Sequence, residues 1–425
     1  MKRMICILLS LAMTLVLAGC AASAPSSDGY GGALNGMGGS KGDAMMDAVG
    51  GVDGEYDAMA PEMAPGESGK VEPEEPVQKP NYTAGTLTAG EWKDADNLDF
   101  WTKLLNRNDW YQLMEDRNLY TNKVVSVYVH DSNGNPCYNV PVQLLTNRET
   151  VYNARTDVNG YAYICYNVYN TDETTAFVMV NETSVEVKDN KVDITAENVG
   201  MEVQALDLML MVDTTGSMGD ELTYLQTELE NVIERVADTG KTLSINVSVN
   251  FYRDEDDDYV VRPFEFTSDI EEAVTQLNAQ RSDGGGDYPE AVHKALDNAV
   301  KEHQWRNGAV KLMFFVLDAP PHSEAEIKGI NAQMTETVQA AAEKGIRIIP
   351  LASSGVDTET EFLLRSWALM TGGTYTFLTD HSGIGNDHLE PTIGEFEVEK
   401  LNECMIRVIC EYCGLEYKTS VDNQQ

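Results

Sequence analysis

Between residues 200 and 416, short apolar runs alternate with longer stretches in which apolar residues recur every three or four positions. The apolar runs cover 206–212, 243–252, 310–317, 346–351 and 374–378. Such runs suit strands that are buried on both faces, and the stretches between them suit amphipathic helices. A chain that alternates strand and helix forms a mostly parallel sheet with helices on both faces. We therefore predict a doubly wound α/β domain at 200–416, with a short tail at 417–425.

Residues 122–197 have a different pattern, in which short β-rich runs are separated by tight turns. Short strands with regularly spaced turn residues predict a small all-β sandwich. Cys137 and Cys165 both fall within this segment, so they could form a disulfide in an exported protein. The order Asp131-x-x-Gly134-x-Pro136, Val140-x-Val142 and Thr156-Asp157-x-x-Gly160 is similar to that of carboxypeptidase-regulatory-like modules. That resemblance implies a spacer role.

The segment before the sandwich divides into two parts. Residues 21–90 are rich in Gly, Ala, Ser, Pro and acidic residues, with few aromatic or β-branched residues. Such a composition buries too little apolar surface to offset chain entropy, so we predict a disordered acidic linker. Residues 91–121 carry aromatic residues at spacings near three and four, which predict short amphipathic helices. Because exposed aromatic patches are rare, we expect these residues to dock onto a neighbouring domain.

The first 20 residues have the pattern of a targeting signal. Lys2 and Arg3 are followed by the apolar stretch Ile5–Leu17, which is shorter than the roughly 20 residues that span a bilayer. The sequence Leu17-Ala18-Gly19-Cys20 resembles a bacterial lipobox. The resemblance implies that residues 1–20 are a lipoprotein signal peptide and that Cys20 is lipidated. We therefore expect a lipid-anchored protein on the extracytoplasmic side of a bacterial cell membrane.

The charge of the chain restricts its partners. The sequence has 69 acidic and 30 basic residues, which gives a formal net charge of -39. A surface of this sign repels nucleic-acid phosphates and anionic lipids, and it attracts cations and basic partners. We therefore expect no nucleic-acid binding.

Three segments place oxygen-bearing side chains where predicted strands end. They are Asp213-Thr214-Thr215-Gly216-Ser217, the segment 284–290 with Asp287 and Glu290, and Asp318. Open α/β sheets bind ligands at the carboxyl ends of their strands. Mg²⁺ and other hard cations prefer oxygen ligands and often keep waters. The segments therefore predict a site for Mg²⁺, or for Mn²⁺ or Ca²⁺. Because few carboxylates would neutralise the metal, it could still accept a carboxylate from a partner.

These segments also carry a family resemblance. Asp213-x-Thr215-x-Ser217 matches the metal-ion-dependent adhesion site (MIDAS) of von Willebrand factor A domains, which have a Rossmann-like fold. Asp287-x-Pro289-Glu290 and Asp318-Ala319-x-x-His322 resemble segments of the integrin beta I-like domain. The resemblance covers half of the chain. It implies a metal held by five residues, namely Asp213, Thr215, Ser217, Glu290 and Asp318.

The same resemblance leaves some ligands open. Either Asp287 or Glu290 could be the direct ligand of the second segment. Four acidic residues match positions that hold adjacent metal ions, namely Asp220, Glu221, Asp254 and Asp287. The first two could instead favour the start of a helix, and the acidic run 254–258 could be a solvated loop. Gly285 stands where the integrin has asparagine, which argues against a third metal.

These features predict a protein that is not an enzyme. A tethered linker, a spacer and a metal site open to an acidic ligand indicate an adhesion module that binds a protein partner. One alternative is an envelope assembly or scaffold factor that uses the same metal. A second alternative is a metal-dependent hydrolase, since bound metals can activate water. The sequence contains no His-Glu metalloprotease motif, no Gly-x-Ser-x-Gly elbow and no Walker loop.

Overall fold

The computed structural model describes residues 82–170, 175–196, 200–239, 242–286, 288–385 and 387–419. All of them belong to one unit of the chain, residues 77–425. The predicted signal peptide, the predicted lipidation site Cys20 and the predicted linker up to residue 81 lie outside the described residues. No helix in the described ranges combines the length and the apolar character that crossing a membrane requires.

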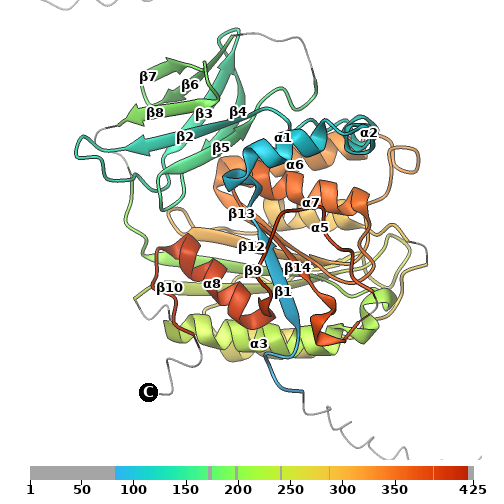
Figure 1. Ribbon diagram of the computed structural model, residues 1–425. Coiled ribbons are helices and arrows are strands. Elements are labelled where there is room, and N and C mark those ends of the chain that lie inside the picture. Colours follow the sequence, from blue (N-terminus) through green and yellow to red (C-terminus); the bar gives the residue numbers. More distant parts are fainter. Residues whose placement is uncertain are drawn as a thin grey trace, which may run out of the picture. The chain divides into compact units, whose positions relative to one another are not determined.

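Within the described residues, eight strands form a central sheet in the order β11-β10-β9-β12-β13-β14-β1-β15 (Figure 1). The five parallel strands are β9 (Ala205–Asp213), β10 (Ser244–Tyr252), β12 (Val310–Leu317), β13 (Ile346–Ala352) and β14 (Tyr375–Leu378). Three short strands pair antiparallel, namely β11 (Val261–Arg262), β1 (Thr88–Trp92) and β15 (Glu399–Lys400). The predicted doubly wound, mostly parallel α/β fold is confirmed.

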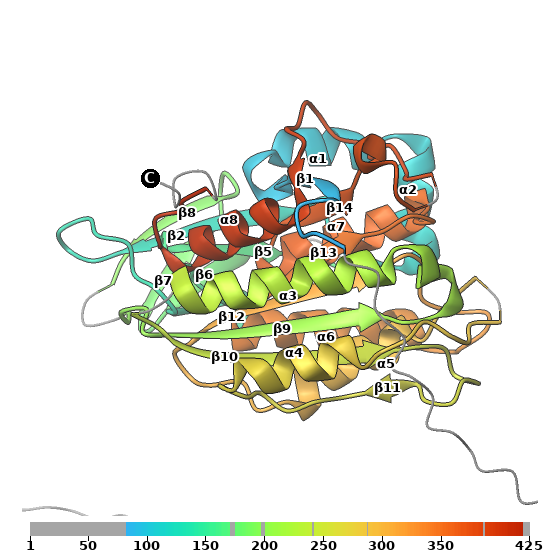
Figure 2. The same ribbon diagram turned by 90° about the horizontal axis from the view of Figure 1, so that it is seen from below.

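Helices cover both faces of this sheet (Figures 1 and 2). One face carries α3 (Leu222–Thr239), α4 (Ile270–Asn278) and α8 (Leu401–Cys413). The other carries α5 (Val292–Asp297), its π-helical continuation η3 (Asn298–Glu302), α6 (Ile330–Lys344) and α7 (Thr358–Thr371). Along β9, Leu208 and Leu210 pack with α3, whereas Met209 and Met211 face the other layer. Both faces of the strand are therefore buried, which explains its uninterrupted apolar sequence.

The strand β1 corrects two predicted boundaries. It pairs antiparallel with β14, from Ala89 opposite Leu378 to Trp92 opposite Tyr375. The residues before it are held by Glu228 of α3, whose carboxylate accepts hydrogen bonds from three successive backbone N–H groups at 85–87. The linker prediction is therefore wrong at its end, residues 88–90, and the sheet is not confined to residues 200–416. Backbone pairing with distant segments fixes this strand, and its five residues have no periodic pattern of their own.

Two helices follow β1 after the short turn η1 (Asp94–Asp96), namely α1 (Leu98–Leu105) and α2 (Asn108–Arg117). They pack on α7, where the rings of Trp101 and Trp110 lie 6.4 Å and 6.3 Å from that of Phe362. The guanidinium of Arg365 lies 4.7 Å from the Trp101 ring, and it pairs with Asp94 at 2.6 Å. The aromatic residues of this segment thus dock onto the neighbouring domain, as predicted.

The β-rich segment consists of two small sheets. One contains β2 (Val124–His130), β5 (Tyr161–Cys165) and β8 (Lys191–Thr195). The other contains β3 (Pro141–Thr146), β4 (Glu149–Arg155), β6 (Ala176–Val180) and β7 (Thr183–Glu186). Residues such as Val127 and Leu144 are fully buried between them. This is the arrangement of the predicted β-sandwich.

The predicted disulfide between Cys137 and Cys165 is wrong. Both thiols are free and buried. Cys165 lies opposite Val124 in β2, whereas the backbone N–H of Cys137 bonds to the carbonyl of Val129. These two positions on β2 are five residues apart, which corresponds to about 17 Å in a strand. A disulfide requires Cα atoms within about 7 Å, so the two cysteines cannot be bridged.

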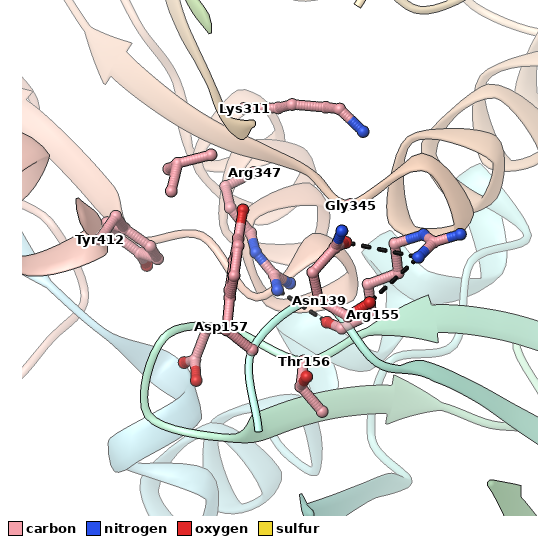
Figure 3. Close-up of a pocket in the computed structure, with 10 residues that line it drawn as sticks. Asn139, Arg155, Thr156, Asp157, Lys311, Gly345, Arg347 and Tyr412 are labelled. Carbon is pink, nitrogen blue, oxygen red and sulfur yellow. Dashed lines mark hydrogen bonds between the residues drawn. The ribbon is translucent and has the colours of Figure 1, made fainter. Parts of the chain in front are cut away.

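Cationic side chains join the sandwich to the central domain, around a cavity of about 10 Å³ (Figure 3). Arg155 of β4 donates to the carbonyl of Glu343, and Lys311 of β12 donates to that of Lys344. Arg347 of β13 donates to the carbonyls of Thr371 and Arg155. Glu343, Lys344 and Thr371 lie in the last turns of α6 and α7, where carbonyls lack helical partners and the helix dipole is negative. The junction therefore uses cations to cap two helices.

Candidate metal centre

Asp213 and Asp318 lie at the carboxyl ends of two neighbouring parallel strands, β9 and β12. Asp213 is the last residue of β9, and Asp318 comes directly after β12. Val212 pairs with Val316, so both strands end at the same edge of the sheet. The chain passes from β9 to β10 on one side, and β12 lies on the other side of β9 (Figure 2). The two carboxylates therefore lie at the switch point, where sheets of this kind bind ligands.

The loop after β9 brings three of the predicted ligands together. Asp213 is fully buried, and its Oδ1 accepts hydrogen bonds from the backbone N–H of Thr215 at 2.8 Å and from Thr215 Oγ1 at 2.7 Å. Thr215 Oγ1 lies 3.1 Å from the hydroxyl of Ser217, which is exposed. Aspartate favours such turns because its carboxylate can accept from the backbone two residues ahead. The loop thus lines up one carboxylate and two hydroxyls from the core towards the surface.

Glu290 reaches the same place from the segment that precedes α5. Its side chain is buried, and its backbone N–H donates to the carbonyl of Pro320, in the loop after Asp318. A Cβ atom placed on Gly285 would lie 3.0 Å from Glu290 Oε1 and 3.2 Å from Thr215 Cβ. Glu290 and Thr215 therefore flank the same glycine. The φ angle of Gly285 is 69°, a conformation that glycine adopts without strain.

Three buried carboxylates in this region lack a hydrogen-bond partner on one oxygen. The oxygens are Asp213 Oδ2, Glu290 Oε2 and Asp318 Oδ1. Buried polar atoms without partners are rare in native proteins, and each costs about 1–3 kcal/mol or more when charged. These three oxygens at one sheet edge are therefore available as acceptors for a ligand.

The electrostatics of the site point the same way. Burial raises the pKa of Asp213 to about 6. Burial and the charge of Asp213 raise the pKa of Asp318 to about 7. The pKa of Glu290 rises to about 9, first through burial and then through the charges of Asp213 and Asp254. Carboxylates this close resist simultaneous ionisation unless a cation offsets their charges.

The donor set fits a hard divalent cation. Every predicted ligand offers oxygen, which Mg²⁺, Mn²⁺ and Ca²⁺ prefer. In the described ranges, no group of three His, Cys, Asp or Glu side chains is arranged so that it could hold a metal ion. Asp213, Glu290 and Asp318 would therefore not hold a metal by themselves, and the hydroxyls of Thr215 and Ser217 and water would have to complete the donor set. Asp213, Glu290 and Asp318 would supply the charge.

The candidate adjacent ligand Asp254 has a protein partner. Its Oδ1 lies 2.8 Å from Nε2 of His322, which is itself buried. His322 thus interacts with an acid beside the centre. The pairing links the loop after β10 to the loop after β12.

Glu221 also has protein partners. Its Oε1 lies 3.1 Å from Nε2 of His388, and its carboxylate accepts from the backbone N–H of Ser354. Burial lowers the pKa of His388, but the carboxylates of Glu221 and Asp380 outweigh this and raise it above its ordinary value. The two carboxylates therefore favour the protonated form of His388 beside Glu221. The side chain of Asp220 and the whole of Asp287 lie outside the described residues.

Two functional neighbours were missed by the sequence analysis. Asp257, predicted as part of a solvated loop, accepts from the backbone N–H groups of Asp254 at 3.1 Å and Gly285 at 2.9 Å. It thereby holds the glycine turn beside the centre. The nearby Gly-rich segment was the available signal for it. His388 lies in a loop without periodicity, and no sequence pattern indicated that it reaches Glu221.

Comparison with known proteins identifies this domain. A family model described as von Willebrand factor A domain matches residues 207–367. The chain contains a von Willebrand factor A domain. Domains of this family generally mediate interactions between proteins. The matched region includes all five predicted metal ligands, and it excludes the sandwich and the helices α1 and α2.

Two curated proteins resemble part of the chain. An ariadne-like RING finger protein from Acanthamoeba polyphaga mimivirus is 30% identical over 139 residues, 32% of this chain and 13% of that protein. Alpha-protein kinase vwkA from Dictyostelium discoideum is 26% identical over 160 residues, 36% of this chain and 25% of that protein. The chain therefore spans a quarter or less of these relatives. Among solved structures, the conserved hypothetical protein BatB from Bacteroides thetaiotaomicron is 14% identical, with a TM-score of 0.34, and covers 49% of this chain and 100% of its own.

The raised pKa values predict how stability without metal depends on pH. Folding raises the pKa of Asp213 to about 6, of Asp318 to about 7 and of Glu290 to about 9, so the folded protein binds more protons than the unfolded chain. Stability in EDTA should therefore be highest below the pKa values of the unfolded acids and should fall as pH rises through the folded values. Thermal unfolding between pH 5 and 9 measures this.

The variant Asp318→Asn serves as the control, because its amide does not ionise. Its melting temperature in EDTA should fall less steeply with pH than that of the wild type. Equal slopes for the two proteins would contradict the account of buried, mutually repelling carboxylates.

Proposed function

We propose that this protein is a membrane-anchored, extracytoplasmic module that binds an acidic group of a protein partner through a divalent cation. The observation that carries the proposal is the set of three buried carboxylate oxygens without partners, on Asp213, Glu290 and Asp318. They lie at the carboxyl edge of a von Willebrand factor A domain, beside the exposed hydroxyl of Ser217. A buried set of negative oxygens next to an exposed donor suits a cation that contacts both protein and partner.

The cation would be held by Asp213, Thr215, Ser217, Glu290 and Asp318. When bound, it supplies a Lewis acid that can accept an oxygen of a partner's aspartate or glutamate. The residues of the chain orient that acceptor. The two backbone and side-chain bonds from Thr215 fix the Asp213 carboxylate, and the bond from the Glu290 N–H to Pro320 fixes the distance between the second and third segments.

A direct contact between this protein and an acidic partner would otherwise be unfavourable. The segments 254–258 and 281–290 that flank the centre carry exposed acidic residues, namely Glu255, Asp256, Asp258 and Asp283, and the whole chain has a formal charge of -39. Like charges repel, so an approaching carboxylate needs a cation between the two surfaces. The proposal therefore requires binding that depends on the metal. An envelope assembly factor would use the same contact with a partner from its own cell.

The sequence of the first 20 residues supports the predicted location. Its basic start, short apolar stretch and Leu17-Ala18-Gly19-Cys20 favour lipidation at Cys20. The acidic, Gly- and Pro-rich segment that follows would give the described domains reach from the membrane surface.

The first prediction from this proposal concerns the metal. Addition of Mg²⁺ to wild-type protein in place of EDTA should raise its melting temperature, because a ligand at about 100 times its dissociation constant stabilises by about 2.7 kcal/mol. The variant Asp213→Ala should lose this increase. The control Asp193→Ala changes an aspartate of the sandwich and should keep it. Calorimetric titration with Mg²⁺ gives the affinity independently.

Partner binding is tested in cells with a photoreactive residue in place of Tyr288, whose exposed side chain lies beside the centre. Crosslinks that disappear in EDTA and in Asp213→Ala would support metal-dependent protein binding, and their identity would tell adhesion from assembly. Crosslinks that are indifferent to both changes would sink the proposal, as would wild-type protein that shows no calorimetric response to Mg²⁺.

The second prediction concerns the anchor. The variant Cys20→Ser lacks the thiol that accepts the lipid, so it should neither incorporate a labelled fatty acid nor remain with the membrane fraction. The wild type should do both, and the control Cys6→Ser should behave like the wild type. Membrane retention and labelling of Cys20→Ser would contradict lipidation at this residue.

A further inference from the structure

Arg117, the last residue of α2, reaches across to the loop that follows β12. Its side chain is buried, and Nη1 donates to the carbonyl of His322 at 2.9 Å, while Nη2 donates to that of Pro321 at 3.2 Å. Its Nε donates to the carboxylate of Glu359 at 2.6 Å, at the start of α7. One guanidinium thus bonds to two carbonyls of one loop. Arginine suits this role because its donors form a rigid planar fork.

The loop that Arg117 contacts has few backbone hydrogen-bond donors of its own. It runs from Asp318 through Ala319, Pro320 and Pro321 to His322. The two prolines have no backbone N–H, so they cannot donate the bonds that usually close a turn. The carbonyl of Pro320 receives its bond from the Glu290 N–H, and the carbonyls of Pro321 and His322 receive theirs from Arg117. The conformation of the loop therefore depends on groups from outside it.

That loop connects the candidate ligands. Asp318 is its first residue, and Pro321 forms a bridge with Glu290 in addition to the bond at Pro320. His322 at its end contacts Asp254 in the loop after β10. A displacement at Pro321 and His322 would therefore reach Asp318 and Glu290 through three or four residues of backbone.

We propose that Arg117 is a positioning residue for the metal centre, so that the contact of α2 with the loop after β12 helps to set the cation affinity of the site. This inference rests on the proposed function. Arg117 lies outside the segment that matches the family model, residues 207–367, so the N-terminal segment contributes a contact to a site within the matched domain. The bonds from Arg117 fix the loop after β12, and this loop in turn fixes the positions of Asp318 and Glu290 relative to each other. Without the Arg117 side chain, the loop would lose two of these three outside donors.

The direction in which Mg²⁺ affinity changes when Arg117 is removed distinguishes a positioning role from a purely electrostatic one. Arg117 is a cation that contacts the loop beginning at Asp318, close to the proposed metal ligands. Its positive charge repels Mg²⁺, so electrostatics alone predicts tighter Mg²⁺ binding when Arg117 is removed. Loss of positioning would weaken binding. Groups that orient metal ligands typically change metal affinity by about 10- to 100-fold when removed. A weaker affinity in a variant that has lost a positive charge therefore points to geometry.

The experiment measures the Mg²⁺ dissociation constant of the full chain by calorimetry for wild type, Arg117→Ala and Arg107→Ala. Arg107 is the matched control, because it lies in the same segment, is exposed and pairs only locally with Asp109. We expect Arg117→Ala to bind Mg²⁺ about tenfold more weakly or worse, and Arg107→Ala to match the wild type. A dissociation constant of Arg117→Ala equal to or tighter than that of the wild type overturns the inference.

Two further variants complete the test. Arg117→Lys keeps the charge but loses the planar fork of donors, so it should also bind Mg²⁺ more weakly than the wild type. If Arg117→Ala does not fold, Arg117→Lys replaces it in the comparison. Glu359→Gln removes the half-exposed ion pair but leaves the bonds to the loop, and it should stay within about twofold of the wild type. Wild-type protein that fails to bind Mg²⁺ would refute the proposed function itself, whereas binding unaffected by Arg117 refutes only this inference.

Discussion

The mutual repulsion of three buried carboxylates is the constraint on which the rest of this structure depends. Asp213, Glu290 and Asp318 come from three separate segments, and each keeps one buried oxygen without a hydrogen-bond partner. Burial and their own charges raise their pKa values, so the folded chain alone stabilises their ionised forms poorly. The repulsion within this set falls when the acids bind protons, and in the proposed function it falls when they share a cation.

The surrounding structure keeps these acids apart from protein cations while it pairs their neighbours. His322 contacts Asp254, and His388 contacts Glu221, so these two outer acids already have side-chain partners. Asp257 and the glycine turn hold the second segment, and Arg117 holds the third. The centre is therefore a small set of carboxylate oxygens without partners, surrounded by polar groups that have partners. This pattern is expected where a protein reserves charge for a ligand.

The sequence was sufficient for the parts of the fold that a local pattern determines. The apolar runs that end at Asp213 and Asp318 predicted both strands and the edge where they meet, because parallel strands buried on both faces have that composition. The sequence could not place β1, Arg117 or His388, because each depends on pairing with residues more than 150 positions away. It also misjudged Cys137 and Cys165, since sequence spacing does not reveal that they lie beside opposite ends of the neighbouring strand β2.

The central claim is that Asp213, Glu290 and Asp318 share one divalent cation with Thr215 and Ser217. Crystals of the protein grown with Mn²⁺ and measured at the manganese absorption edge test it most directly. The account predicts an anomalous peak between these five side chains that is absent in Asp213→Ala. A peak only at the acidic loop 254–258, or no peak at the edge between β9 and β12, would contradict it.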